Sequence, residues 1–221
     1  MNKNIFQDPE ILNSPSYLIT EQIFNAITHG AGLILAIIGT IYLTSESYHL
    51  PGVLPFVSYL IFGLSMIWMY LMSTLYHSLY FTKVKPIFQF FDHSSIFILI
   101  AGSFTPFALV MVGGWLGWTI FAVQWLVAIV GISAKMLNHA WIRKYSTAVY
   151  LTMGWLALLL IPTIIRQLPT LGIVSLVSGG VMYTIGTLFY SLSDQYTYFH
   201  VIWHFFVMLG SIGIFIAACL I

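Results

Sequence analysis

Residues 199–220 read FHVIWHFFVMLGSIGIFIAACL, a stretch without Asp, Glu, Lys or Arg. A helix needs roughly 20 such apolar residues to cross the hydrocarbon core of a bilayer, which is about 30 Å thick. Six further apolar stretches precede this one along the chain, and their only charged residues are Glu21 and Asp92. We therefore predict seven membrane-spanning helices, at residues 21–44, 53–78, 90–112, 115–134, 146–165, 171–191 and 199–220.

The composition of the whole chain agrees with this prediction. Of its 221 residues, 60% are hydrophobic and 6% are charged, and the mean hydropathy is +0.96. A soluble domain carries about 25% charged residues, so a soluble globular protein, a disordered chain and a nucleic-acid binder are excluded. The predicted fold class is all-α integral membrane, with a short cytoplasmic tail at 1–20 and one seven-helix transmembrane bundle at 21–221.

The basic residues indicate the orientation of this bundle. Six lie in the tail and in two loops on one side of the membrane, and one lies on the other side: Lys3, Lys83, Lys85, Lys135, Arg143 and Lys144, against Arg166. Because cytoplasmic loops carry the excess of Lys and Arg, we expect the N-terminus in the cytoplasm and the C-terminus outside. The protein is then a multi-pass protein of the cell (plasma) membrane.

Glycine and proline mark the turns and the expected close contacts. The breaks between spans contain residues that end a helix or permit positive φ: Pro51-Gly52, Gly113-Gly114 and Pro169. Small residues inside spans allow helices to approach closely, and the candidates are Gly30, Gly32, Gly179 and Gly180.

Ionisable side chains inside a span are costly unless they are paired, so they indicate a functional site. The candidates are His29, His77, Asp92, His93, His200 and His204, with Ser73 as a neutral companion. His200 and His204 are four residues apart and share one helix face, as do Ser73 and His77. At 1.5 Å per residue, His77, Asp92, His200 and His204 all lie within roughly 10 Å of the cytoplasmic face.

Three imidazoles and one carboxylate at the same depth favour a metal site. Zinc accepts neutral imidazole nitrogens, and three protein ligands leave a fourth position open at a catalytic site. We predict zinc as the cofactor, with the ligands His77, His200 and His204. A water molecule could occupy the open fourth position. Asp92 would then orient a histidine or act as the base that holds this water, and Ser73 would hydrogen-bond substrate or water. Without a metal, the same residues could form interhelical hydrogen bonds or a buried His–Asp ion pair.

Two other histidines are assigned less directly. His93 lies about 100° around the helix from Asp92, so we expect it outside the set of metal ligands. His29 is expected deeper in the membrane than the others, either as a hydrogen-bond partner of the site or as a packed polar residue. The single Cys219 excludes a thiolate cluster.

Four motifs occur in order along the chain: Ser73-x-x-x-His77, Phe91-Asp92-His93-Ser94, the run AGSFTPF at 101–107, and His200-x-x-x-His204. Together they resemble the bacterial hemolysin III family. That family belongs with the progestin and adipoQ receptors and is more distantly similar to the alkaline ceramidases. The resemblance implies a seven-helix fold with a cytoplasmic-side zinc on the three histidines, with Asp92 and Ser73 beside it. It also implies amide hydrolysis of membrane lipids.

Several functions are compatible with these residues, and whether the protein is an enzyme stays open. The first hypothesis is a zinc-dependent hydrolase of membrane lipid amides or esters, in which the lipid is the substrate and partner. The alternative is a non-enzymatic membrane homeostasis or lipid-sensing protein with structural zinc. A third is a cytolytic activity like that of a hemolysin, which nothing in the residues favours. Ion transport is disfavoured, because the polar residues gather at one face rather than across the bilayer.

Overall fold

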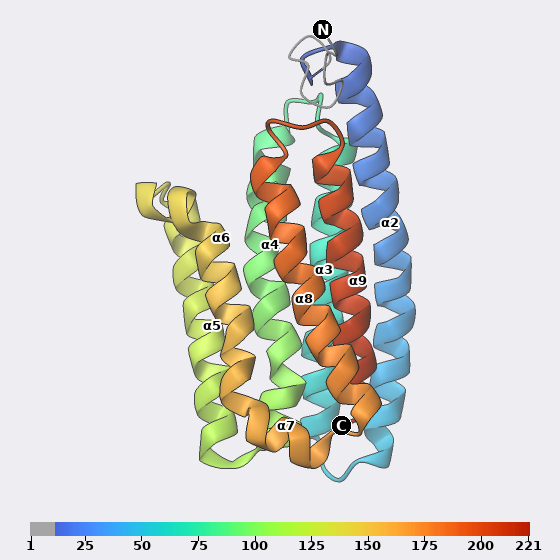
Figure 1. Ribbon diagram of the computed structural model, residues 1–221, viewed down its shortest axis with the longest axis vertical. Coiled ribbons are helices and arrows are strands. Elements are labelled where there is room, and N and C mark those ends of the chain that lie inside the picture. Colours follow the sequence, from blue (N-terminus) through green and yellow to red (C-terminus); the bar gives the residue numbers. More distant parts are fainter. Residues whose placement is uncertain (1–11) are drawn as a thin grey trace, which may run out of the picture.

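The computed structural model describes residues 12–221, and Lys3 with the rest of residues 1–11 lies outside this range. Within it, seven helices are long and apolar enough to cross a membrane, which confirms the seven predicted spans. They lie side by side in one bundle (Figure 1). The long helices are α2 (Pro15–Glu46), α3 (Leu54–Ser78), α4 (Lys85–Pro106), α5 (Gly114–Met136), α6 (Ala140–Trp155) with α7 (Ile161–Gln167), α8 (Thr170–Leu192) and α9 (Phe199–Ala218).

Some helix ends differ from the predicted ones, because local capping rather than hydropathy sets them. The first helix begins at Pro15 instead of residue 21, since the Ser14 side chain accepts a hydrogen bond from the Tyr17 N–H at 3.3 Å. Serine is a favoured N-cap, and proline fits the first helical turn. The helix α4 also begins early, at Lys85, five positions before the apolar run; it has a proline in its first turn but no side-chain cap.

Two spans contain irregular turns that the apolar pattern did not predict. The third span continues α4 through a π-helical segment, Phe107–Val112, and ends at Gly113 and Gly114, whose φ angles are +62° and +54°. Those angles require glycine, as expected for this turn. The fifth span consists of α6, a 3-10 segment at Leu156–Leu160, and α7. Short 3-10 and π segments inside a long helix frequently mark hinges or functional sites.

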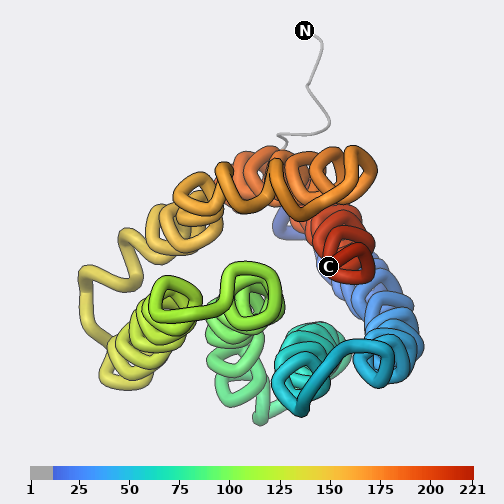
Figure 2. Tube along the Cα trace, turned by 90° about the horizontal axis from the view of Figure 1, so that it is seen from below, coloured from blue at the N-terminus to red at the C-terminus, as the bar shows by residue number. Residues whose placement is uncertain are grey.

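Neighbours in sequence are neighbours in space around the bundle, and α9 packs on α2 to close it (Figure 2). The α4 span is the most buried, with 67% of its apolar window inside the protein. The helices α8 and α9 approach closely at Gly179, where a Cβ would lie 2.9 Å from the Gly210 carbonyl oxygen. The expectation is wrong for Gly180, which faces open space.

The charged loops divide the bundle into two ends (Figure 1). Lys83, Lys85, Lys135, Arg143 and Lys144 lie in or beside the α3–α4 and α5–α6 connections, and Arg166 lies in α7. We call the end with the α3–α4 and α5–α6 connections the basic end, and the sequence assigns it to the cytoplasm. The end with Arg166 is the opposite end. The functional residues discussed below lie toward the basic end.

Candidate metal centre

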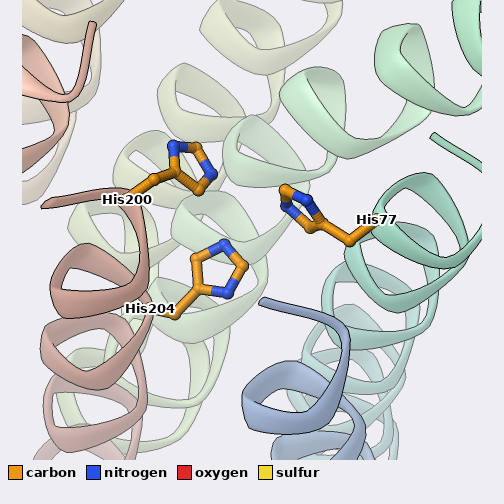
Figure 3. Close-up of side chains that lie close together, drawn as sticks. All are labelled: His77, His200 and His204. Atoms are coloured by element: carbon orange, nitrogen blue, oxygen red, sulfur yellow. The ribbon is translucent and has the colours of Figure 1, made fainter. Parts of the chain in front are cut away.

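Three histidines from two helices meet near the basic end of the bundle (Figure 3). His77 lies in the last turn of α3, and His200 and His204 lie in the first two turns of α9. One ring nitrogen of each lies within 4.8 Å of the others. The structure therefore brings together the three residues that the sequence predicted as ligands.

The start of α9, which carries His200, is anchored to α2. Tyr198 precedes the helix with a left-handed φ of +61°, an uncommon conformation for a bulky residue. Its backbone N–H donates to the Tyr17 hydroxyl at 3.1 Å, and that hydroxyl donates to the buried carboxylate of Glu21. These contacts fix the position at which α9 begins.

Hydrogen bonds from α2 also determine which ring nitrogen of two histidines faces the cluster. Nδ1 of His77 lies 2.7 Å from the Gln22 side-chain oxygen, which can only accept, so Nδ1 carries the proton. Nδ1 of His204 lies 3.3 Å from the carbonyl oxygen of Asn25 and is protonated for the same reason. In both neutral rings the lone pair is then on Nε2.

This arrangement is what a metal site requires. Metal-bound histidines usually donate their second ring N–H to an acceptor, as His77 and His204 do here. Nε2 of His77 is buried and has no hydrogen-bond partner within residues 12–221. Three nitrogens on a tetrahedral zinc lie about 3.3 Å apart, so small side-chain rotations would close the observed spacing. The cluster could therefore hold a metal ion.

Asp92 and Ser73 lie beside the histidines on the wall of one cavity, together with His200 and His204. The Asp92 carboxylate is largely buried, and its Oδ2 is 3.9 Å from Nε2 of His93. His93 is not part of the three-histidine group, as expected. The structure thus places the acid of the α4 span where it can reach a ligand in the cavity.

His29 lies at the level of the cluster rather than deeper. Its ring stacks on that of His204, with centroids 3.5 Å apart and planes 5° apart. The reason is that α2 begins earlier than predicted and extends farther at the basic end (Figure 1). The contacts of Gln22 with His77 and of Asn25 with His204 were not predicted, nor was the position of the Thr28 hydroxyl 3.2 Å from Nδ1 of His204. Their spacing of three residues was a visible signal, since it places a polar stripe on one face of α2.

The cavity beside the histidines has a volume of about 390 Å³ and mostly apolar walls. This size is typical of sites that bind small molecules. Leu158 in the 3-10 segment and Val177 in α8 line the cavity and are also more than half exposed, at 52% and 57%. The cavity therefore reaches the lateral surface between α6–α7 and α8, where a membrane protein meets lipid.

A bundle of seven spans with a cluster of three histidines near one end, two of them buried and one half-buried, defines a class of multi-pass membrane protein. The family model described as "Haemolysin-III related" matches residues 17–215, and the chain belongs to this family. It is 39% identical to Hemolysin-3 of Bacillus cereus over 206 residues, which cover 93% of this chain and 94% of that protein. It is 40% identical to the Hemolysin-3 homolog of Bacillus subtilis (strain 168) over 199 residues, covering 90% and 93%.

A more distant relative is the human Monocyte to macrophage differentiation factor. It is 27% identical over 192 residues, which cover 85% of this chain and 78% of that protein. This match agrees with the predicted relationship to the progestin and adipoQ receptors. The comparisons confirm the family and the multi-pass membrane location that the sequence predicted.

Proposed function

We propose that the protein is a zinc-dependent hydrolase of membrane lipid amides or esters, with zinc held by His77, His200 and His204. The observation that carries the proposal is the position of the histidine cluster, which opens on an apolar cavity that reaches the lateral surface. A site that served only to join helices would not need such a cavity. A lipid chain could lie along the apolar walls, with its polar linkage next to the histidines.

Each residue has a role in this proposal that follows from its chemistry. The Nε2 lone pairs of His77 and His204 point to the cluster, because α2 holds the opposite ring nitrogens. When bound, zinc supplies a Lewis acid that polarises a carbonyl group and activates water. Asp92, the one carboxylate that residues 12–221 place on the cavity wall, would orient that water and accept its proton. Ser73 hydrogen-bonds the substrate, and the apolar walls exclude bulk water.

The proposal is tested by combining metal analysis with turnover. We expect the protein purified in detergent to contain about one zinc per chain. Asp92→Asn should retain the zinc but lose about 10²–10⁴-fold in the hydrolysis of amide- or ester-linked lipids, measured by mass spectrometry of the products. The matched control is Asp194→Asn, because Asp194 is an exposed acid at the same end. Absence of zinc, or full turnover by Asp92→Asn, would refute the proposal.

A second candidate is a non-enzymatic membrane homeostasis or lipid-sensing protein, in which zinc is structural. One observation favours it: the two histidine-bearing helices, α3 and α9, are also hydrogen-bonded to α2 through Gln22 and Asn25. A metal here would tie three helices together. In this case Asp92→Asn would preserve the function in cells, while His77→Ala would lower the melting temperature and abolish it.

A further inference from the structure

His29 is a buried polar residue that the proposed hydrolytic site does not use. It lies in the middle of α2, and 3% of its surface is exposed. One ring face stacks on His204, and the Tyr70 ring meets it edge-on at a centroid distance of 5.2 Å. Neither ring nitrogen has a hydrogen-bond partner within residues 12–221. The ring also faces the backbone of His204, but without the geometry of a hydrogen bond.

This lack of partners sets His29 apart from the histidines of the cluster. His77 and His204 each have Nδ1 bonded to α2, and their remaining nitrogens face one another. His29 has no such hydrogen bond to a neighbouring helix and is not one of the clustered ligands, although its ring touches His204. Leaving both nitrogens of a buried imidazole unpaired is costly, so the ring is expected to have a hydrogen-bond partner that is not part of the protein.

The surroundings of His29 define the chemistry of that partner. The ring borders the cavity, and no Lys or Arg of the described chain is among the residues that line it. A phosphate or carboxylate placed there would meet no cationic side chain of the described residues, and it would share the cavity with Asp92. A metal ion on the histidine cluster would attract such an anion, so charged and uncharged ligands are compared in protein freed of metal. A neutral imidazole offers one donor and one acceptor. A hydroxyl group, which both donates and accepts without carrying charge, complements either nitrogen.

We propose that His29 is a binding subsite for a hydroxyl group of an uncharged lipid whose chain lies in the cavity. Such binding needs neither a metal nor hydrolysis, so the inference goes beyond the proposed function. The Tyr183 hydroxyl lines the same cavity, but it is already 2.7 Å from the Ser211 hydroxyl, which also bonds Tyr70. His29 is therefore the better placed of the two to bind a ligand.

We test this subsite with three probes that share the oleoyl chain. These are 1-monooleoylglycerol, which has hydroxyl groups; methyl oleate, which has no hydroxyl group; and oleate, which is charged. The full-length protein is placed in phosphatidylcholine nanodiscs, and bound probe is measured by native mass spectrometry. We expect the wild type to bind 1-monooleoylglycerol about tenfold more tightly than methyl oleate, the discrimination typical of one buried hydrogen bond. Oleate should bind more weakly than 1-monooleoylglycerol to protein freed of metal by a chelator, because its carboxylate then meets no metal ion.

The matched variants are His29→Phe and Ser103→Ala. Phenylalanine keeps a flat ring against His204 but has no ring nitrogen, so the preference for 1-monooleoylglycerol should disappear. Ser103 also lines the cavity, but its hydroxyl donates to the Ile100 carbonyl at 2.9 Å, so Ser103→Ala should retain the preference. The melting temperature of His29→Phe without probe should not fall, because no protein hydrogen bond is lost.

The outcomes separate this inference from the proposed hydrolysis. An equal preference in wild type and His29→Phe would overturn the subsite, as would a metal-free wild type that binds oleate most tightly. A protein that contains no zinc, yet loses its preference in His29→Phe, would refute the zinc hydrolase and support the subsite. Zinc content should be the same in His29→Phe as in wild type, because His29 is not among the three grouped histidines.

Discussion

Two parts of the bundle are built differently, and the difference separates the candidate chemistry from access to it. We call the part formed by α2, α3 and α9 the histidine half. In it, 50% of the α3 span and 50% of the α9 span are buried, and polar side chains form hydrogen bonds between the helices. In the outer half, formed by α5, α6 and α7, only 22% of each span is buried. Its fifth span is broken by a 3-10 segment that borders the cavity.

The proposed function accounts for this difference. Metal ligands must be held within fractions of an ångström, which dense packing and hydrogen bonds to a neighbouring helix provide. If a lipid chain enters the cavity between helices, those helices must move apart, which loosely packed helices with an irregular turn can do. Changes in the histidine half should therefore alter metal binding, and changes in the outer half should alter stability or access alone.

The largest effect is expected from His204→Ala in the histidine half. The substitution removes one of three grouped nitrogens, so bound metal should be lost entirely and the melting temperature should fall. Metal is measured by mass spectrometry of the purified protein, and stability by thermal unfolding. His139→Ala is the control, because His139 is exposed at the same end of the bundle. Full metal content in His204→Ala would show that the cluster is not the metal site.

Gln22→Leu should weaken metal binding without abolishing it. The side-chain oxygen of Gln22 accepts from Nδ1 of His77 and so fixes its tautomer. Loss of such a partner typically costs about 10–100-fold in metal affinity, which a chelator competition would measure. Gln195→Leu, at an exposed position of the same end, should leave the affinity unchanged. If both variants bind metal equally well, α2 does not orient the ligands and the proposed distinction between the halves is weakened.

The sequence predicted the seven spans and the grouping of the histidines, because both depend on local patterns. Apolar length defines a span, and His200 and His204 share a face by helical spacing alone. The meeting of His77 with that pair followed from the alternation of helix directions, which brings the end of α3 and the start of α9 to the same side. These inferences needed no knowledge of which helix packs on which.

The contacts of α2 could not be predicted, since they depend on how far this helix extends and which face it turns to α3 and α9. Gln22 reaches His77, and His29 stacks on His204, because α2 packs against both α3 and α9 and turns this face toward them. The close contact expected at Gly180 is wrong for a similar reason, because the sequence does not show which residues of a helix face its neighbour. Gly179 and Gly180 are adjacent in sequence, yet one faces α9 and the other faces open space.

These adjacent glycines provide a test of the packing against α9. A Cβ at Gly179 would lie 2.9 Å from the Gly210 carbonyl oxygen and 3.1 Å from the Ile214 backbone nitrogen, so Gly179→Ala would push two backbones apart. We expect a loss of about 1–3 kcal/mol in the free energy of unfolding. Gly180→Ala meets no atom within 4 Å and should be neutral or slightly stabilising. Equal stability of the two variants in denaturant titrations would contradict this packing.

The smallest effect is expected from Gln124→Leu in the outer half. Gln124 is fully buried in α5, and its Nε2 donates to the Met153 carbonyl at 2.9 Å, just before the 3-10 segment. That carbonyl also accepts a backbone N–H, and the Gln124 Oε1 has no partner in the described chain. Removing the amide therefore costs one hydrogen bond and relieves one unpaired atom, so the net loss should be below about 1 kcal/mol.

Hydrogen exchange would show whether Gln124→Leu acts only on the outer half. We expect faster exchange in the segment from Met153 to Leu160, and metal affinity equal to that of the wild type. Gln167→Leu, at an exposed position in α7, should change neither quantity. A fall in metal affinity in Gln124→Leu would mean that the outer half supports the histidine geometry after all. The two halves would then form one cooperative unit, and a change in the entry route of a lipid into the cavity would also change the metal centre.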